Sequence, residues 1–212
     1  LGAAVHVRAL ERQLEILREM GCNAVRTSHN PPAPELLDLC DRMGFLVMDE
    51  LFDMWKSAKK GNDYHRHFDA WHERDAIALI HRDRNHPCVV LWSTGNEVPE
   101  QGGAAGRAIS KMLTDIFHRE DPTRLVAAGC NNHAAAYNGF ADTIDVMGFN
   151  YPPRQEKLYQ DFRQRRPRQP VFGSETSSCV SSRGIYFFPV DWNKAKGFFQ
   201  FQMSPDGRSF TG

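Results

Sequence analysis

Two glutamates in this chain each follow a short run of apolar and small residues. Glu97 ends the segment 92–97 (WSTGNE), and Glu175 follows the segment 171–174 (VFGS). Each segment is typical of a buried strand, at whose end a carboxylate has no role in packing. In an α/β barrel, catalysis takes place at the C-terminal ends of the strands. The two glutamates therefore predict a carboxylate pair, and glycoside hydrolysis is the chemistry that most needs such a pair.

In the retaining form of that chemistry, the two carboxyl groups have different tasks. One protonates the departing glycosidic oxygen, while the other attacks the anomeric carbon, and the two groups lie roughly 5–5.5 Å apart. Asn96 directly precedes Glu97 and offers an amide that suits the 2-hydroxyl of a sugar. The structural alternative is that Glu97 caps the following turn and that Glu175 forms a salt bridge with a nearby arginine.

Strand and helix patterns alternate along the chain, which predicts a parallel sheet with helices outside it. We expect helices at 7–20, 35–43, 68–84, 106–119 and 154–165, and strands at about 23–28, 45–49, 88–93, 125–129, 144–150 and 171–174. This pattern predicts a (β/α)8 TIM barrel whose first and last strands are missing. A doubly wound open sheet is the alternative, although its glycine-rich phosphate loop is absent from the sequence. We interpret residues 1–212 as a single partial catalytic domain, with a loop-rich segment at about 176–212 and at most a short helix near 192–201.

The composition disfavours several classes of partner. Lysine plus arginine and aspartate plus glutamate both number 26, so neither nucleic acid nor an anionic membrane is expected as a partner. No apolar run approaches the roughly 20 residues of a membrane helix. The sequence has no basic-then-apolar leader, and we leave the compartment open. The five cysteines lack metal-binding spacing and are expected to be buried free thiols.

Five motifs, in order, resemble the catalytic barrel of family-2 glycoside hydrolases, the group of β-galactosidases, β-glucuronidases and β-mannosidases. They are 21–31 (GCNAVRTSHNP), 44–50 (GFLVMDE), 82–87 (RDRNHP), 91–97 (LWSTGNE) and 173–175 (GSE). The stretch 174–184 (SETSSCVSSRG) is most similar to the β-galactosidase-type members of gut and polysaccharide-degrading bacteria. The resemblance implies a retaining exo-β-glycosidase, with β-galactosides as the expected substrates.

The resemblance also implies roles for individual residues. Glu97 matches the general acid/base, Glu175 the nucleophile and Asn96 the amide that binds the 2-hydroxyl. Arg26 would favour the ionised nucleophile, and Tyr151 would donate a hydrogen bond to it. The remaining residues that we expect to bind sugar or support the site are His29, Asp49, Asn150 and Trp55, with further aromatic rings from Tyr186, Phe187, Phe188 and Trp192. The alternatives are a buried ion pair of Arg26 and Asp49 that braces the strands, and simple loop packing of the aromatic residues.

The expected cofactors and partners follow from the same resemblance. No organic cofactor is expected. Some β-galactosidases bind magnesium through a glutamate and a histidine beyond the Asp-Glu pair, but residues 51–56 (LFDMWK) lack both, so a metal is not expected. Residues 193–196 (NKAK) do not fit the Asn-x-Lys motif of glucuronidases, which disfavours that activity. We expect an oligosaccharide or β-glycoside substrate, preceding β-sandwich domains and a possible homo-oligomer.

Two other kinds of protein are compatible with parts of the pattern. One is a non-catalytic carbohydrate-binding piece, or an excised fragment of a larger glycosidase, because a barrel with missing strands has open edges. The other is a metal-dependent barrel hydrolase, for which only His29 and Asp49 come close to being ligands. His65, His67, His72 and His81 are expected to have surface or capping roles, because no motif for metal binding accompanies them.

Overall fold

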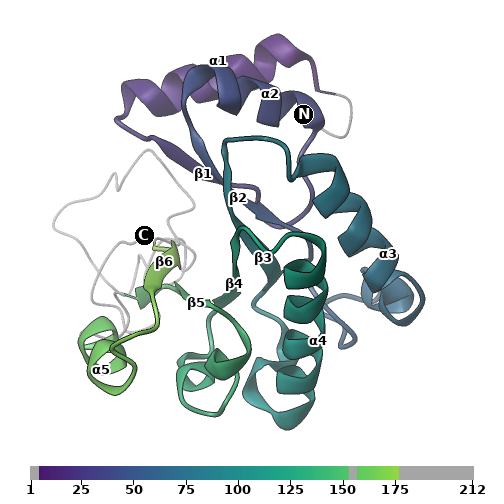
Figure 1. Cartoon of the computed structure of the whole chain (residues 1–212), viewed down its shortest axis with the longest axis vertical. Coiled ribbons are helices and arrows are strands. Elements are labelled where there is room, and N and C mark those ends of the chain that lie inside the picture. Colours follow the sequence, from purple (N-terminus) through teal and green to yellow (C-terminus); the bar gives the residue numbers. More distant parts are fainter. Residues whose placement is uncertain (1–4, 153–156, 177–212) are drawn as a thin grey trace, which may run out of the picture.

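The structure, a computed structural model, describes residues 5–152 and 157–176, and it contains one curved parallel sheet (Figure 1). The strands are β1 (Ala24–Arg26), β2 (Leu46–Glu50), β3 (Val89–Asn96), β4 (Leu125–Cys130), β5 (Val146–Asn150) and β6 (Val171–Glu175). Each strand pairs in parallel with the next one along the chain, in the order β1-β2-β3-β4-β5-β6. Sequential parallel pairing is the arrangement of a (β/α)8 barrel, and the described residues form six of its strands.

Helices connect the strands and lie on the outer side of the sheet (Figure 1). They are α1 (Val7–Glu19), α2 (Pro34–Met43), α3 (His65–Asp83), α4 (Ala104–Glu120) and α5 (Leu158–Arg165), with short 3₁₀ segments η1 (Pro99–Gly102), η2 (His133–Ala136) and η3 (Ala141–Thr143). All six predicted strands and the first five predicted helices are confirmed, with ends that differ by a few residues. The predicted helix near 192–201 and almost all of the segment 176–212 lie outside the described residues.

Local sequence signals explain where individual elements begin and end. Pro34 opens α2, where its fixed backbone angle suits a first helical turn and its missing N–H costs nothing. Gly44 ends the same helix with φ at 76°, a left-handed conformation that glycine adopts without strain. The chain then enters β2 directly, so the α2–β2 connection is tight.

The strands alternate between two faces, and each face has its own apolar cluster. On the outer face, Val47, Trp92 and Val126 belong to the main core, together with helix residues such as Phe117. On the inner face, the smaller cluster contains Met48, Ala127 and Val146, with the partly buried Leu91 and Phe172 against it. The inner cluster belongs to the interior of the barrel.

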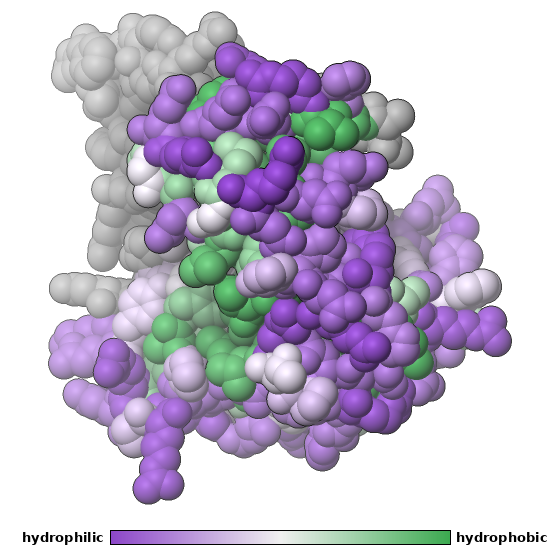
Figure 2. Space-filling view, turned by 45° about the horizontal axis from the view of Figure 1, so that its top comes forward, coloured by the Kyte–Doolittle hydropathy of each residue, from purple (hydrophilic) through white to green (hydrophobic). Residues whose placement is uncertain are grey.

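Part of the apolar surface stays exposed. Figure 2 shows a band of apolar side chains that crosses an otherwise largely hydrophilic face. At the starts of β2 and β4, Leu46 and Leu125 are 47% and 50% exposed.

None of the helices in the described ranges combines the length and the apolar character needed to cross a membrane.

Candidate active site

The C-terminal ends of β3, β5 and β6 carry the candidate catalytic side chains. Glu97 follows the last residue of β3, and Glu175 is the last residue of β6. Within the described residues, two non-glycine residues have a positive φ, namely Glu97 at 45° and Tyr151 at 60°. Such backbone conformations cost on the order of 1–3 kcal/mol and cluster at functional sites. Parallel strands bring these three ends to the same edge of the sheet.

Arg26, the last residue of β1, lies between two carboxylates. Its Nη1 atom donates to Glu175 Oε1 at 2.9 Å, and its Nε and Nη2 atoms donate to Glu50 Oε2 at 2.9 and 2.7 Å. The Arg26 side chain is 11% exposed and that of Glu50 is completely buried. A buried carboxylate needs this kind of pairing, because an unpaired one would be strongly destabilising. Arg26, on β1, thus links Glu50 on β2 to Glu175 on β6, which is the strand at the opposite edge of the described sheet.

Two further groups contact Glu50. His29 Nδ1 lies 2.7 Å from Glu50 Oε1, while its Nε2 atom lies 3.6 Å from Glu175 Oε1. Ser93 Oγ donates to Glu50 Oε2 at 2.7 Å. Both oxygens of Glu50 therefore have hydrogen-bond partners, and Glu50 contacts Arg26 and His29, which both lie beside Glu175.

Tyr151 binds the other oxygen of Glu175. Its hydroxyl donates to Glu175 Oε2 at 2.7 Å, opposite the contact from Arg26 to Oε1. Each carboxylate oxygen thus receives a hydrogen bond from a different element. Two directional donors fix the orientation of a carboxylate far better than one.

Two asparagines connect Glu97 to the same network. Asn150 Nδ2 donates to Glu97 Oε1 at 2.8 Å and to Asn96 Oδ1 at 3.0 Å. Asn96 Oδ1 also accepts from Arg26 Nη2 at 2.9 Å. The path Glu97–Asn150–Asn96–Arg26–Glu175 is therefore continuous. The two glutamates, which are far apart in sequence, share one hydrogen-bonded cluster.

Gly129, in β4, leaves the room that this cluster occupies. A Cβ atom at this position would lie 2.8 Å from Arg26 Nη2 and 3.2 Å from the Oδ1 atoms of both Asn96 and Asn150. Sequence reasoning missed Gly129, Glu50 and Ser93. For Gly129 the available signal was a glycine inside a strand, which marks a close approach of other groups.

The expected place of Asp49 in the site is wrong. Asp49 and Glu50 are neighbours in β2, and neighbouring strand residues point to opposite faces. Glu50 points to the cluster, while Asp49 is fully buried near Asp83 and Arg82. Burial, with the nearby Asp83, raises the pKa of Asp49 to about 8. The alternative of an ion pair between Arg26 and Asp49 is also wrong, because Arg26 pairs with Glu50.

The expected stacking of a sugar on Trp55 is not supported either. Trp55 is completely buried, its Nε1 atom donates to the carbonyl of Thr94 at 2.9 Å, and its ring stacks on Phe140. It anchors the loop between β2 and α3 rather than facing a ligand. Tyr186, Phe187, Phe188 and Trp192 lie outside the described residues.

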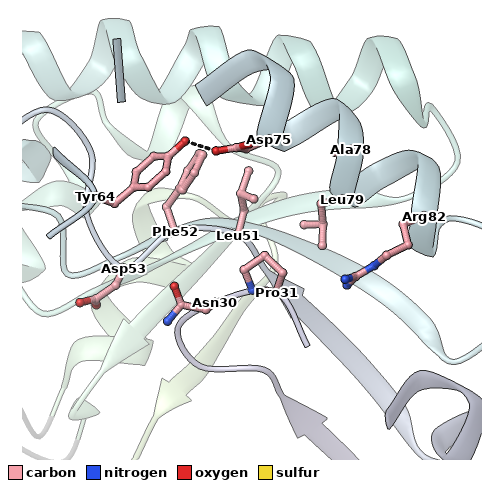
Figure 3. Close-up of a pocket in the computed structure, with 10 residues that line it drawn as sticks. All are labelled: Asn30, Pro31, Leu51, Phe52, Asp53, Tyr64, Asp75, Ala78, Leu79 and Arg82. Carbon is pink, nitrogen blue, oxygen red and sulfur yellow. Dashed lines mark hydrogen bonds between the residues drawn. The ribbon is translucent and has the colours of Figure 1, made fainter. Parts of the chain in front are cut away.

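A pocket of about 280 Å³ adjoins the cluster (Figure 3). Leu51, Phe52 and Leu79 contribute apolar side chains, while Asn30 and Asp53 are among its polar residues. Asn30 follows His29 in the chain, and Asp53 Oδ1 accepts a hydrogen bond from Asn96 Nδ2 at 3.2 Å. The pocket therefore lies beside the cluster, between the ends of β1 and β2 and helix α3.

The residues beyond Asp49 and Glu50 do not fit a magnesium ion, which prefers several oxygen ligands. Met54 is buried and apolar, and Asp53, the carboxylate within residues 51–56, is paired with the ammonium group of Lys59 at 2.7 Å. A positive charge thus already neutralises the carboxylate that a metal would need.

A second group of possible metal ligands lies at the opposite end of the sheet. Asp41, His86 and Cys88 each offer a ligand atom, and these atoms lie within 4.8 Å of one another. Asp41 already accepts hydrogen bonds from the backbone N–H of Cys88 at 2.8 Å and pairs with His86 Nδ1 at 2.7 Å. Burial raises the pKa of the Cys88 thiol, whereas a metal needs the thiolate. This group is therefore explained by its hydrogen bonds.

Comparison with known protein families gives one match over most of the chain. The model described as "Glycosyl hydrolases family 2, TIM barrel domain" matches residues 1–202. Among curated proteins, a β-galactosidase of Bacteroides ovatus is 44% identical over 90% of this chain and 26% of its own length. Human β-glucuronidase is 35% identical over 66% of this chain and 21% of its own length.

Solved structures agree with these matches. A glycosyl hydrolase family 2 member from Bacteroides cellulosilyticus superposes with a TM-score of 0.78 at 40% identity, over 84% of this chain and 23% of that one. A β-glycosidase from Bacteroides vulgatus gives a TM-score of 0.75 at 34% identity, over 96% of this chain and 26% of that one. The chain spans about a quarter of the length of these proteins.

Proposed function

This chain belongs to glycosyl hydrolase family 2, and from that membership we propose that it forms the catalytic barrel of a retaining exo-β-glycosidase. The observation that carries the proposal is the continuous hydrogen-bonded path between Glu97 and Glu175 at one edge of the sheet. Retaining hydrolysis needs two carboxyl groups that act on the same glycosidic bond, and a shared network holds them in a fixed relation.

In the proposed reaction, Glu175 is the nucleophile. Its carboxylate attacks the anomeric carbon, and the bond to the leaving group breaks as a bond to Glu175 Oε forms. Arg26 and Tyr151 each donate to one oxygen of this carboxylate, which keeps it oriented toward the sugar. The product of this step is a glycosyl-enzyme ester.

Glu97 is the proposed acid and base. In the first step its carboxyl proton passes to the glycosidic oxygen as the aglycone leaves. In the second step the Glu97 carboxylate takes a proton from water, whose oxygen attacks the anomeric carbon and releases Glu175. Asn150 holds Glu97 through Oε1. We assign the amide of Asn96 to the sugar 2-hydroxyl, because Asn96 directly precedes Glu97 in the chain.

β-Galactosides are the proposed substrates. The β-galactosidase of Bacteroides ovatus matches 90% of this chain at 44% identity, whereas human β-glucuronidase matches 66% at 35%. β-Glucuronides are the second candidate, because several relatives carry that name. As partners of the barrel we propose an oligosaccharide or other β-glycoside substrate and preceding β-sandwich domains in the intact protein.

A panel of nitrophenyl glycosides, tested on the intact protein, decides among these substrates. We expect the highest kcat/KM with the β-galactoside. Higher activity on the β-glucuronide would correct the substrate, and no activity on any β-glycoside would contradict the proposed function.

The roles of the two glutamates are tested with glycosides of the sugar that gives the highest kcat/KM in this panel. Glu175→Gln should abolish turnover of all substrates, because the covalent intermediate cannot form. Glu97→Gln should lower kcat/KM by roughly 10²–10⁴ for poor leaving groups and much less for activated aryl groups, which need little protonation. Azide should restore activity to the Glu97 variant. Glu73→Gln, on the exposed side of α3, is the control. Equal losses for both kinds of leaving group would argue against Glu97 as the acid.

A further inference from the structure

We propose that Lys59, on the loop between β2 and α3, is a positioning residue that holds the Asn96–Glu97 peptide and thereby the carboxyl group of Glu97. The proposal rests on the function proposed above. The residues that follow Asp49 and Glu50 do not fit a magnesium ion. The positive charge beside Asp53 is instead the ammonium group of Lys59.

Lys59 and Asp53 together hold both polar parts of Asn96. Lys59 Nζ donates to the backbone carbonyl of Asn96 at 2.7 Å and to Asp53 Oδ1 at 2.7 Å. The same Asp53 oxygen accepts from Asn96 Nδ2 at 3.2 Å. The side chains of Lys59 and Asp53 are 22% and 29% exposed, so the contacts are partly shielded from water. Asn96 is thus held through its main chain and its side chain at once.

The carbonyl of Asn96 needs a partner from outside the sheet. The register between β2 and β3 ends at the pair Glu50 and Ser93, and the register between β3 and β4 shifts between Ser93 and Asn96. The end of β3 therefore lies beyond regular pairing with β2. A backbone carbonyl that is shielded from water requires a hydrogen bond, and the ammonium group of Lys59 supplies it.

The same peptide leads into a strained residue. Glu97 has φ at 45°, in the left-handed region that non-glycine residues rarely adopt. Its N–H donates to the carbonyl of Gly129 at 2.7 Å, which fixes the peptide from the β4 side. Lys59 fixes the carbonyl of the same peptide from the β2 side. A strained conformation persists only where surrounding contacts determine it, and these two contacts do so.

The loop holds Lys59 ready for this role. Trp55 anchors its first part, and the backbone N–H groups of Lys59 and Lys60 donate to Asp63 Oδ2 at 2.8 and 2.6 Å. These contacts within the protein therefore fix the backbone of Lys59 before any ligand binds. Asp53 also borders the pocket of Figure 3, in which its carboxylate points away from the apolar side chains of Leu51 and Phe52.

Lys59→Met tests the proposal in the intact protein, because it keeps most of the length of the side chain and removes its charge. We expect kcat/KM for glycosides with poor leaving groups to fall about tenfold or more, since general acid catalysis supplies roughly 10²–10⁴-fold and is only weakened here. Activated aryl glycosides should lose less than about threefold. Lys59→Arg should retain part of the activity. The exposed neighbour provides the matched control, Lys60→Met, which should change neither class.

Two kinetic outcomes and one structural outcome would overturn the proposal. Equal losses for both classes of leaving group would assign Lys59 a general structural role. Activity like that of Lys60→Met would show that Lys59 has no role. If the wild-type protein hydrolyses no β-glycoside, the proposed function fails. A crystal structure of Lys59→Met then still tests whether Lys59 positions the Asn96–Glu97 peptide. A reoriented Asn96–Glu97 peptide supports the positioning role, and an unmoved one excludes it.

Discussion

At the scale of single residues, the arginine at the end of β1 organises the site. Its guanidinium group contacts Glu50, Glu175 and Asn96, and so joins a buried carboxylate, the proposed nucleophile and the amide next to the proposed acid. The planar, multidentate donor set of arginine suits this geometry, and lysine could not reproduce it. The guanidinium group can occupy the barrel interior because the facing position on β4 is a glycine.

The prediction at this scale concerns that glycine. Gly129→Ala would place a methyl group 2.8 Å from Arg26 Nη2, so the guanidinium group must shift. A displacement of about 1 Å at a catalytic group can cost on the order of 10²-fold in rate, whereas the overpacking costs about 1–3 kcal/mol of stability. We therefore expect kcat/KM to fall far more than the thermal midpoint.

Gly61→Ala is the control for this experiment, because no atom lies within 4 Å of the Cβ it would add. It should leave kcat/KM and the thermal midpoint unchanged. Full activity of Gly129→Ala would mean that the position of Arg26 does not matter for the reaction.

At the scale of secondary-structure elements, β2 separates two neighbouring acids. Glu50 faces the catalytic cluster, while Asp49 lies on the helix side of the sheet, where its Oδ2 atom is buried and has no hydrogen-bond partner within the described residues. Burial and the adjacent Asp83 raise the pKa of Asp49 to about 8. The neutral carboxyl is the form that this position favours.

The prediction at this scale follows from linkage. A raised pKa in the folded state means that the stability gained below the ordinary aspartate pKa, near 4, is lost as the pH rises to about 8. Asp49→Asn removes this titration, so the variant should gain stability relative to the wild type as the pH rises. We expect its advantage in thermal midpoint to be a few degrees larger at pH 8 than at pH 5.

The catalytic cluster offers a control for that measurement. Ser93→Ala removes a hydrogen bond to Glu50 without touching Asp49, so its effect on the midpoint should not follow the same pH course. A constant difference between Asp49→Asn and the wild type from pH 5 to pH 8 would contradict the raised pKa of Asp49.

At the scale of the whole molecule, the six strands form part of a barrel. Within the described ranges, β1 and β6 each pair on one side only. Leu46 and Leu125 stay about half exposed, and Figure 2 shows the apolar band on one face. Unpaired strand edges and exposed apolar surface promote association with other chains.

The prediction at this scale concerns residues 1–212 produced on their own. We expect this piece to bind a hydrophobic dye such as ANS and to aggregate, as measured by light scattering, while the intact protein neither binds the dye nor aggregates. Leu125→Lys should reduce aggregation of the piece, because it places a charge on the exposed apolar surface, whereas Lys60→Met should not reduce it. A monomeric piece without dye binding would show that these residues bury their own apolar surface.

Much of the fold was predictable because its signals are local. Helical and strand periodicity, the helix end at Gly44, and the alternation of elements depend on residues close together in the chain, and they led to a parallel (β/α)8 barrel. The positions of Glu97 and Glu175 at strand ends were local signals of the same kind. One error concerned Asp49 and Glu50, where a shift of one residue along the strand decides which side chain faces the cluster. The other concerned Trp55, whose role depends on its complete burial.

The sequence by itself determined the order of the elements and which strand ends carry carboxylates, since both depend on local pattern. The tertiary structure alone decided which side chains meet. Arg26 and Glu175 are 149 residues apart, and their contact depends on how the sheet curves. The room left by Gly129 and the contact of Lys59 with Asn96 likewise depend on strand register and loop conformation. Contacts between distant residues are set by the packing of whole elements, and no local pattern records them.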